Sequence, residues 1–563
     1  MASNDGERAA LARAASSRSL KSEKQASDLE KQEVLSGPTP VGAVRVGEEL
    51  QRQMKPRHVA MISIGGAIGT GLFLGTANAL RHGGPLGLLL GYSLVGTIVY
   101  AVMSALGELA SHLPIPGGQV TLAARFVSPA FAFVTGWYYW YDWALALPAE
   151  LSASAVLISY WNDSINPAAW ITVTGVVAIA INFGGARLYG EAEFWFAGIK
   201  VVTIIGLIIL GVILTAGGGP SGEVIGGSNW REPFVQYLNI QGSLGRFLGF
   251  WAVLVQAAYS YIGAEIVALA AAETSNPKKA IPTAIRSVWV RLLLFYVIGV
   301  FIIGLLVPSN DPRLNLGSGT AASSPFVIAM TDSGIKVLPS IINAALLTSA
   351  WSAASSDLYT ASRALYGLAL QGNAPRIFAR TNSWGLPWVA TVGSASLALL
   401  AYMSTSSGAG RAFGYFSNMT SVCGLLLWWA VCITYLRFYY AAKAQGFDRK
   451  ALPYVAPLQP YLTYYAVVLI SVILFFSNFT VFVNGNWSTS DFITSYLPII
   501  LFPVVFVIVY CHKRFIRGAP REIWSTMPLA ELDLISGSRS DETEDVEEKK
   551  PTTWYGKILA FLF

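Results

Sequence analysis

The stretch IGGAIGTGLF, residues 64–73, places four glycines within seven positions of an otherwise apolar segment. Each glycine costs about 1 kcal/mol against alanine in a helix, so the chain can leave the helical conformation here at little cost. Irregular backbone at membrane depth is tolerated only where it is buried in protein or lines a polar cavity. We therefore expect an interrupted helix whose backbone amides face a polar ligand. Close helix packing through small residues is the simpler alternative, and the two uses can coexist.

A second interruption is expected in YSYIGAE, residues 259–265, five apolar stretches further along the chain. Corresponding breaks in two halves indicate an inverted repeat of five plus five helices. The positive end of the half-helix after the first break favours a carboxylate. Carbonyl groups around residues 258–260 would accept hydrogen bonds from an ammonium group, and Tyr261 would shape or gate the pocket for the side chain. The two breaks together would hold both ends of a zwitterion.

The composition indicates a membrane protein. The chain has 563 residues, of which 54% are hydrophobic and 12% are charged, against roughly 25% charged residues in soluble domains. Apolar stretches of about 20 residues are long enough to cross a bilayer as helices. We expect an all-α polytopic membrane protein with about twelve spans. These spans lie near residues 58–80, 86–108, 130–160, 168–183, 194–216, 247–272, 288–307, 338–370, 387–403, 413–437, 461–483 and 492–512.

The spans leave no room for a large soluble catalytic domain. The four histidines lie near predicted span ends without metal-type spacing, so we expect no enzyme, cofactor or metal. The expected domains are a disordered cytoplasmic N-terminal tail at 1–55, a transmembrane domain at 56–516 and a cytoplasmic C-terminal tail at 517–563. An excess of Lys and Arg in alternate loops favours both termini inside, and it explains the basic charge without nucleic acid. Asn162 and Asn486 then lie in outer loops, where glycosylation stays open.

Ionisable residues inside the predicted spans are few, and such residues usually line a pathway for ions or protons. Glu150, Lys200 and Glu265 are the candidate proton-coupling residues, and Asp142 and Asp357 lie in the third and eighth spans. A permanent structural ion pair between Lys200 and one carboxylate is the alternative, with its partner open.

Several motifs occur in order along the chain. They are residues 63–73, Gly83-Gly84-Pro85, Gly107-Glu108-Leu109, residues 193–200 (EFWFAGIK), Gly263-Ala264-Glu265, Asn276-Pro277-Lys278-Lys279, residues 362–365 (SRAL), residues 372–375 (GNAP) and Leu452-Pro453-Tyr454. With them the chain resembles the fungal amino-acid permeases (YAT type) of the amino acid-polyamine-organocation superfamily. The resemblance implies a LeuT-type fold with broken helices 1 and 6, and alternating access around a central site. It also implies proton symport of L-amino acids at the plasma membrane, with lipid as surroundings.

The resemblance also assigns roles by position. The substrate-binding residues would be Ile68, Gly69, Thr70, Gly71, Ala258, Tyr259, Ser260, Tyr261 and Gly263. Lys200 falls where relatives use a lysine in place of a sodium ion. Relatives often have Asn in the eighth span where this chain reads SAASSD, residues 352–357, so the preference among neutral amino acids, proline and acidic amino acids stays open.

Two further points follow from the resemblance. Ubiquitin-ligase machinery would act on N-terminal lysines such as Lys21, Lys24 and Lys31, although a merely solvated tail is an equal alternative. An amino-acid sensor with the same fold is the competing function. A sensor would be expected to carry long, motif-rich cytoplasmic extensions, and the modest N-terminal tail favours the carrier.

Overall fold

The computed structural model describes residues 68–115, 117–266, 281–282, 285, 288–290, 292–315, 324–382, 385–483, 485–512, 515, 527–536 and 538. The expected tail at 1–55 with Lys21, Lys24 and Lys31, the motif residues 63–67 and the motif at 276–279 lie outside the described residues.

Helices make up the regular structure of the described residues, and these residues form no strand. The α-helices are α3 (Thr76–His112), α4 (Gly118–Phe126), α5 (Pro129–Ile158), α6 (Pro167–Phe183), α7 (Gly185–Thr215), α8 (Gly242–Tyr261), α11 (Ile298–Leu306), α12 (Pro325–Asp332), α13 (Leu338–Leu370), α14 (Trp388–Ala395), α15 (Ser404–Ser407), α16 (Ala409–Ala444), α17 (Tyr461–Phe475) and α18 (Thr489–Cys511). Short π or 3₁₀ turns are η1 (Gly71–Gly75), η2 (Ser228–Trp230), η3 (Tyr237–Asn239), η4 (Leu292–Val297), η5 (Pro312–Leu314), η7 (Arg376–Ala379), η8 (Ser396–Met403), η9 (Arg449–Ala451), η10 (Phe479–Phe482) and η12 (Leu529–Glu531).

Local sequence explains where several of these helices begin. Ser128 precedes α5 in an extended conformation, and its hydroxyl accepts a hydrogen bond from the Phe131 amide at 3.2 Å. Asn166 caps α6 in the same way through the Ala168 amide at 2.9 Å. A proline follows each cap, where its missing N–H is not needed.

A sharp bend divides α3 into two helical pieces. Gly84 has φ 72° and ψ 177°, and Pro85 follows it. A Cβ atom at Gly84 would lie 2.7 Å from the Pro233 carbonyl oxygen, so a larger residue would meet both steric and conformational strain. The bend falls between the first and second predicted spans, so the described parts of these two spans form separate helical pieces.

Each of the twelve predicted spans overlaps helical residues. By length and apolar composition, six helices of the described chain are able to cross a membrane: Gly71–His112, Leu188–Thr215, Val288–Leu306, Trp388–Ser406, Ala409–Ala444 and Thr489–Cys511. Two shorter apolar helices are Pro167–Phe183 and Tyr461–Phe475. The multi-pass, all-helical prediction is confirmed, and the number twelve stays a prediction.

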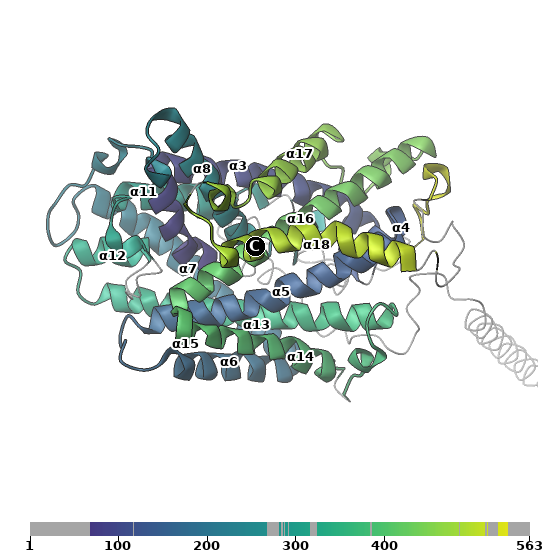
Figure 1. Ribbon diagram of the computed structural model, residues 1–563, viewed down its shortest axis with the longest axis horizontal. Coiled ribbons are helices and arrows are strands. Elements are labelled where there is room, and N and C mark those ends of the chain that lie inside the picture. The colour runs from purple at the N-terminus through teal and green to yellow at the C-terminus, as the bar shows by residue number, and fades with distance from the viewer. Residues whose placement is uncertain are drawn as a thin grey trace, which may run out of the picture. The chain divides into compact units, whose positions relative to one another are not determined.

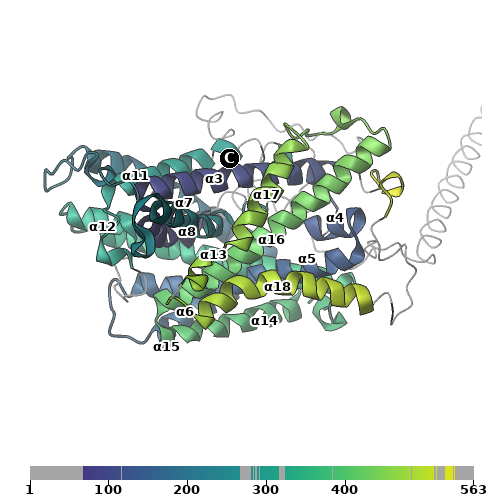
Figure 2. The same cartoon turned by 45° about the horizontal axis from the view of Figure 1, so that its top comes forward.

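The long helices pack side by side. Helix α5 lies against α13 and α16, α3 packs against α8, and α17 runs beside α16 (Figures 1 and 2). Large apolar side chains point away from this packing, for example Val202 at 73% exposure and Phe475 at 70%. Exposed apolar surface of this kind is expected where helices contact lipid.

A buried ion pair joins one end of α3 to the segment after α16. Glu108 is fully buried, and its two carboxylate oxygens each accept a 2.8 Å hydrogen bond from Arg449. The Tyr435 hydroxyl and the Ala456 amide donate to the same carboxylate at 3.0 and 2.7 Å. All these donors satisfy a charge that would be costly if left alone.

Part of the expected C-terminal tail packs against this same end of the helices. Leu532 and Leu534 are buried in an apolar cluster with Phe126 and Phe438. Gln445, which directly follows α16, donates to the Leu532 carbonyl at 2.8 Å. The segment 527–536 is therefore attached to the helical domain, which the division at residue 516 does not anticipate.

An ion-pair cluster near η5 joins two other connecting segments. The Arg313 guanidinium donates to Asp311 and to Asp332, with shortest N–O distances of 2.6 Å to each. These hydrogen bonds hold the pKa of Asp311 below its ordinary value. Asp311 also accepts from the Arg313 amide and so begins η5.

Candidate functional site

Glu150, in the second half of α5, links the start of η1 to the end of α8. Its Oε1 atom accepts a hydrogen bond from the Thr70 hydroxyl at 2.7 Å and another from the Tyr259 hydroxyl at 3.2 Å. Thr70 immediately precedes η1, and Tyr259 lies in the last turn of α8. Glu150 is 5% exposed, so these contacts lie inside the protein.

Glycines in the first stretch allow this close approach. A Cβ atom at Gly71 would lie 2.7 Å from the Ser260 Cα, which is closer than real Cβ contacts. A Cβ at Gly69 would lie 3.7 Å from Glu150 Oε1, so Gly69 passes directly over the carboxylate. Ile68 is buried in the core beside them. Residues 71–75 form a π-helical turn, a feature found often at functional sites.

Helix α8 ends at Tyr261, where the second interruption was expected. Ile262 is extended, with φ −60° and ψ 139°, and Gly263 has φ 102°, which favours glycine. The Ile262 amide donates to the carbonyls of both Ala258 and Tyr259, at 3.2 and 3.3 Å. Both carbonyls therefore already accept one hydrogen bond, and the bond to Ala258 is an ordinary bond of the helix end. Each carbonyl oxygen keeps a second lone pair.

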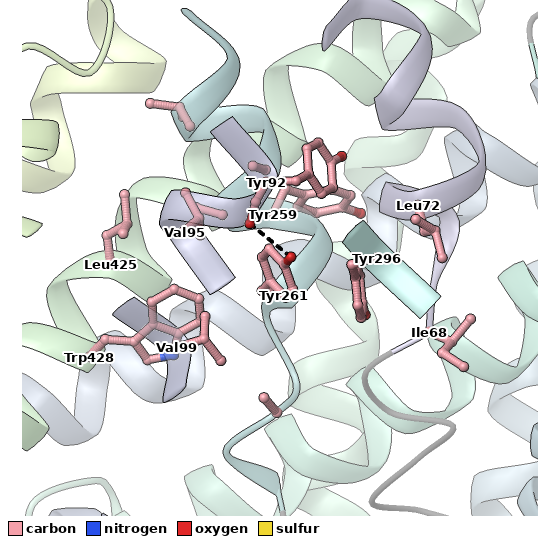
Figure 3. Packing of buried hydrophobic residues seen from close by; sticks show 14 of the residues in the cluster. Ile68, Leu72, Tyr92, Val95, Val99, Tyr259, Tyr261, Tyr296, Leu425 and Trp428 are labelled. Carbon is pink, nitrogen blue, oxygen red and sulfur yellow. Dashed lines mark hydrogen bonds between the residues drawn. The ribbon is translucent and has the colours of Figure 1, made fainter. Parts of the chain in front are cut away.

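Tyr261 and Ser260, at the end of α8, contact two further tyrosines, Tyr92 and Tyr296. The Tyr261 hydroxyl donates to the Tyr92 carbonyl at 2.9 Å, as the dashed line in Figure 3 shows. Its ring lies 4.3 Å from that of Tyr296, and Ser260 Oγ lies 2.8 Å from the Tyr92 hydroxyl. Tyr261 is 1% exposed and is held in place on all sides. These contacts hold the Tyr261 side chain in a packed position, and its role in shaping or gating the pocket stays a prediction.

Tyr259 instead lines a cavity of about 470 Å³. The cavity lies among the first part of α3, α8, the start of α16 and residues 477–480. Its polar lining residues are Asn78, Arg81, His82, Gln256, Asn315, Arg411, Ser417, Asn418, Ser421, Ser477, Asn478, Thr480 and Asp491, with the hydroxyl of Tyr415 and Tyr237 beside them. Phe413 also lines it, and its ring packs edge-on against Tyr259 at 5.8 Å. Tyr259 therefore lies between this cavity and Glu150.

Lys200 pairs with a carboxylate of its own helix. Its Nζ atom lies 3.8 Å from Glu193 Oε1, and both side chains are 1% exposed. Ser352 of α13 donates to the other Glu193 oxygen at 2.6 Å. The Lys200 charge also acts on Glu150 and Asp357, so these groups form one electrostatic system.

Glu265, four residues after the end of α8, contacts α16. Its Oε2 atom accepts a hydrogen bond from Trp428 Nε1 at 3.3 Å. Asp142 of α5 is fully buried nearby, and the two carboxylates interact electrostatically. The structure thus brings Gly69, Thr70, Gly71, Tyr259 and Glu150 together, whereas Lys200 and Glu265 have separate partners.

Three residues of this region, Glu193, Phe413 and Tyr92, were not identified from the sequence as members of the site. Glu193 and Lys200 are seven residues apart, two helical turns, so their spacing on one helix face was the available signal. Phe413 and Tyr92 gave no such signal, because apolar and aromatic residues are common in every span.

The bundle of long apolar helices, the buried Glu150 carboxylate that joins η1 to α8 and the neighbouring polar cavity are features of a multi-pass membrane transporter. The chain belongs to the amino acid permease family, whose sequence profile matches residues 58–518. It is 39% identical to the dicarboxylic amino acid permease of Saccharomyces cerevisiae, covering 91% of this chain and 87% of that protein. It is 38% identical to the proline-specific permease of Emericella nidulans, covering 93% and 95%. The lysine-specific permease of S. cerevisiae is 39% identical, with 91% and 83% covered.

These relatives confirm the resemblance drawn from the motifs, and they are permeases rather than enzymes. The fold is similar to a crystal structure of the manganese transporter of Eremococcus coleocola in complex with an aromatic bis-isothiourea substituted compound. The TM-score is 0.50 at 15% identity, covering 81% of this chain and 92% of that one. This similarity concerns the fold alone.

Proposed function

We propose that this permease imports L-amino acids across the plasma membrane together with protons, by alternating access around the interrupted helices. The observation that carries the proposal is the Glu150 carboxylate, which accepts hydrogen bonds from both Thr70 and Tyr259. A group that contacts both broken helices can link its own protonation to their relative position. We further propose the five-plus-five repeat, twelve spans and cytoplasmic termini that the sequence predicts.

The substrate's carboxylate would bind at the amides of residues 69–71, at the positive end of the helix that follows. Its ammonium group would bind the remaining lone pairs of the carbonyls at the end of α8. The cavity beside Tyr259 would be the entry path, with the packed rings of Tyr259 and Phe413 as the barrier between the cavity and the site.

Glu150 is suited to accept a proton at a defined atom. Oε1 already accepts two hydrogen bonds, whereas Oε2 is buried and has no hydrogen-bond partner among the described residues. Protonation at Oε2 would remove the negative charge and weaken the hold on Thr70 and Tyr259, because hydrogen bonds to charged groups are stronger than those to neutral ones. Lys200 would supply the fixed positive charge of this system.

The test is uptake of radiolabelled amino acids by yeast cells that lack their own amino-acid permeases and express the full chain. We expect a protonophore to abolish uphill uptake. Glu150→Gln should lose uphill uptake but still exchange labelled for unlabelled substrate in proteoliposomes, because exchange needs no net proton movement. The exposed Glu223→Gln is the matched control. Uphill uptake that survives in Glu150→Gln would refute Glu150 as the proton carrier.

A further inference from the structure

Asp142 and Glu265 form a pair of buried carboxylates beside the end of α8 and against α16. Asp142 is 0% exposed and Glu265 is 3% exposed. We refer to these two residues as the acidic pair. The mechanism proposed above uses neither of them directly.

The acidic pair is assembled around the interruption itself. A Cβ atom at Gly424 of α16 would lie 2.7 Å from Ile262 Cδ1 and 3.8 Å from Asp142 Oδ2. Gly424 thus leaves space where the extended residue of the break, the Asp142 carboxylate and α16 meet. Trp428, one helical turn further along α16, donates to Glu265. Both carboxylates therefore lie along the same part of α16, next to Ile262.

The hydrogen-bonding capacity of the acidic pair is largely unfilled. Neither Asp142 oxygen has a hydrogen-bond partner among the described residues, and the same holds for Glu265 Oε1. No Lys, Arg or His of that part of the chain forms an ion pair with either residue. Two uncompensated carboxylates inside a membrane protein are costly unless a cation or protons accompany them.

The wider surroundings are also negative. Six carboxylates of the described residues are buried in the helices or beside the break: Glu108, which pairs with Arg449, and Asp142, Glu150, Glu193, Glu265 and Asp357. The buried basic side chains of the described residues are Lys200 and Arg363. An acidic substrate would add another negative charge to this excess, whereas a basic substrate would compensate it.

We propose that the preferred substrates are cationic L-amino acids, and that Asp142 and Glu265 bind the ammonium or guanidinium group of the substrate's side chain. This inference rests on the proposed function. Ile262 lies three residues beyond Tyr259, roughly one helical turn or about 5 Å. An extended lysine side chain, with four carbons and bonds of about 1.5 Å, reaches roughly 6 Å from Cα to Nζ. A substrate bound at the end of α8 can therefore present its terminal cation to the acidic pair.

Arginine and citrulline provide a direct test, because they have nearly the same shape but differ in charge. We expect the wild-type permease to take up arginine with a KM at least about tenfold below that of citrulline, as suits a charge-assisted contact. Asp142→Asn and Glu265→Gln should each raise the KM for arginine by a larger factor than the KM for citrulline, and so reduce this preference. Asp142→Glu, which keeps the charge, should restore part of the preference, and Glu223→Gln is the control for expression.

The outcomes are distinguishable. Uptake of neutral or acidic amino acids with no preference for arginine would overturn the substrate class but leave the proposed permease function in place. An unchanged arginine-to-citrulline ratio in both neutralised variants would show that the acidic pair binds protons or serves packing. Absence of uptake for every amino acid, with the protein at the cell surface, would overturn the proposed function as well. The wild-type preference is measurable even if a variant fails to fold.

Discussion

The Thr70 hydroxyl donates a 2.7 Å hydrogen bond to the Glu150 carboxylate, and this bond connects the start of η1 to α5. The bond is inside the protein, since Thr70 is 1% exposed. A backbone interruption and a titratable carboxylate are thus joined by one polar contact. Any change of position between η1 and α5 has to break or move this contact.

Removal of the Thr70 hydroxyl should impair transport with little change in fold. Thr70→Val keeps the shape but lacks the donor, and hydrogen bonds to charged groups contribute about 1.5–3 kcal/mol. We expect roughly ten- to hundredfold slower uptake at unchanged surface expression. Thr70→Ser keeps the donor and should retain most of the uptake. Equal rates for the Val and Ser variants would contradict the role of this bond.

The close approach at Gly71 makes a steric prediction. In Gly71→Ala the new methyl group would lie 2.7 Å from the Ser260 Cα, and backbone cannot move aside cheaply. Overpacking of this kind costs about 1–3 kcal/mol, so we expect lower thermal stability and loss of uptake. Gly198→Ala and Gly206→Ala meet no atom within 4 Å and serve as matched controls. Those two should be neutral or up to about 1 kcal/mol more stable, because alanine favours the helix.

The ion pair of α7 should show strong coupling between its two members. Glu193→Gln removes the carboxylate beside Lys200, and disruption of a buried pair costs about 3–5 kcal/mol. The double variant Glu193→Gln with Lys200→Met should recover part of this loss, since no charge is left behind. Thermal unfolding in detergent measures the stability of the wild type, of Glu193→Gln, of Lys200→Met and of the double variant. If the double variant is less stable by the sum of the single effects, the two residues do not act as a pair.

The Arg313 cluster predicts where acid begins to affect stability. Its hydrogen bonds lower the pKa of Asp311 in the folded protein, so their stabilisation is fully present above the ordinary Asp value of about 3.9. It is lost only as the pH falls through the lower, folded pKa. Thermal stability of the wild type relative to Asp311→Asn should therefore be constant from pH 7 to 5 and decline below about pH 4. A difference that shrinks already near pH 6 would contradict this assignment.

The all-helical, multi-pass fold was predictable from the sequence because hydropathy locates membrane helices. The end of α8 near Tyr261 and the close approach at Gly71 depend on two glycines, Gly263 and Gly71. A larger side chain would be strained at Gly263 and would clash at Gly71. Glu150 was also recognisable, since a charge inside an apolar span is rare. These signals are local, and a single sequence contains them.

Other features depend on the rotation of helices about their axes. Tyr259 and Tyr261 are two residues apart and so face different directions, and the sequence alone did not distinguish the cavity-lining residue from the packed one. The carbonyls around residues 258–260 were expected to be available to a substrate, and those of Ala258 and Tyr259 already accept a hydrogen bond from the Ile262 amide. The docked segment with Leu532 and Leu534 lacks a long apolar run, so its attachment was not foreseen.

The pairing of Glu193 with Lys200 on one helix has an electrical consequence. Moving one elementary charge through the membrane potential changes the energy by about 2.3 kcal/mol per 100 mV. Because the charges of Glu193 and Lys200 cancel, and the other two charged residues of α7, Arg187 and Glu191, are also of opposite sign, a shift of this helix moves almost no net charge through the field. The voltage sensitivity of each transport cycle then depends on what crosses with the substrate, and α7 itself contributes little to it.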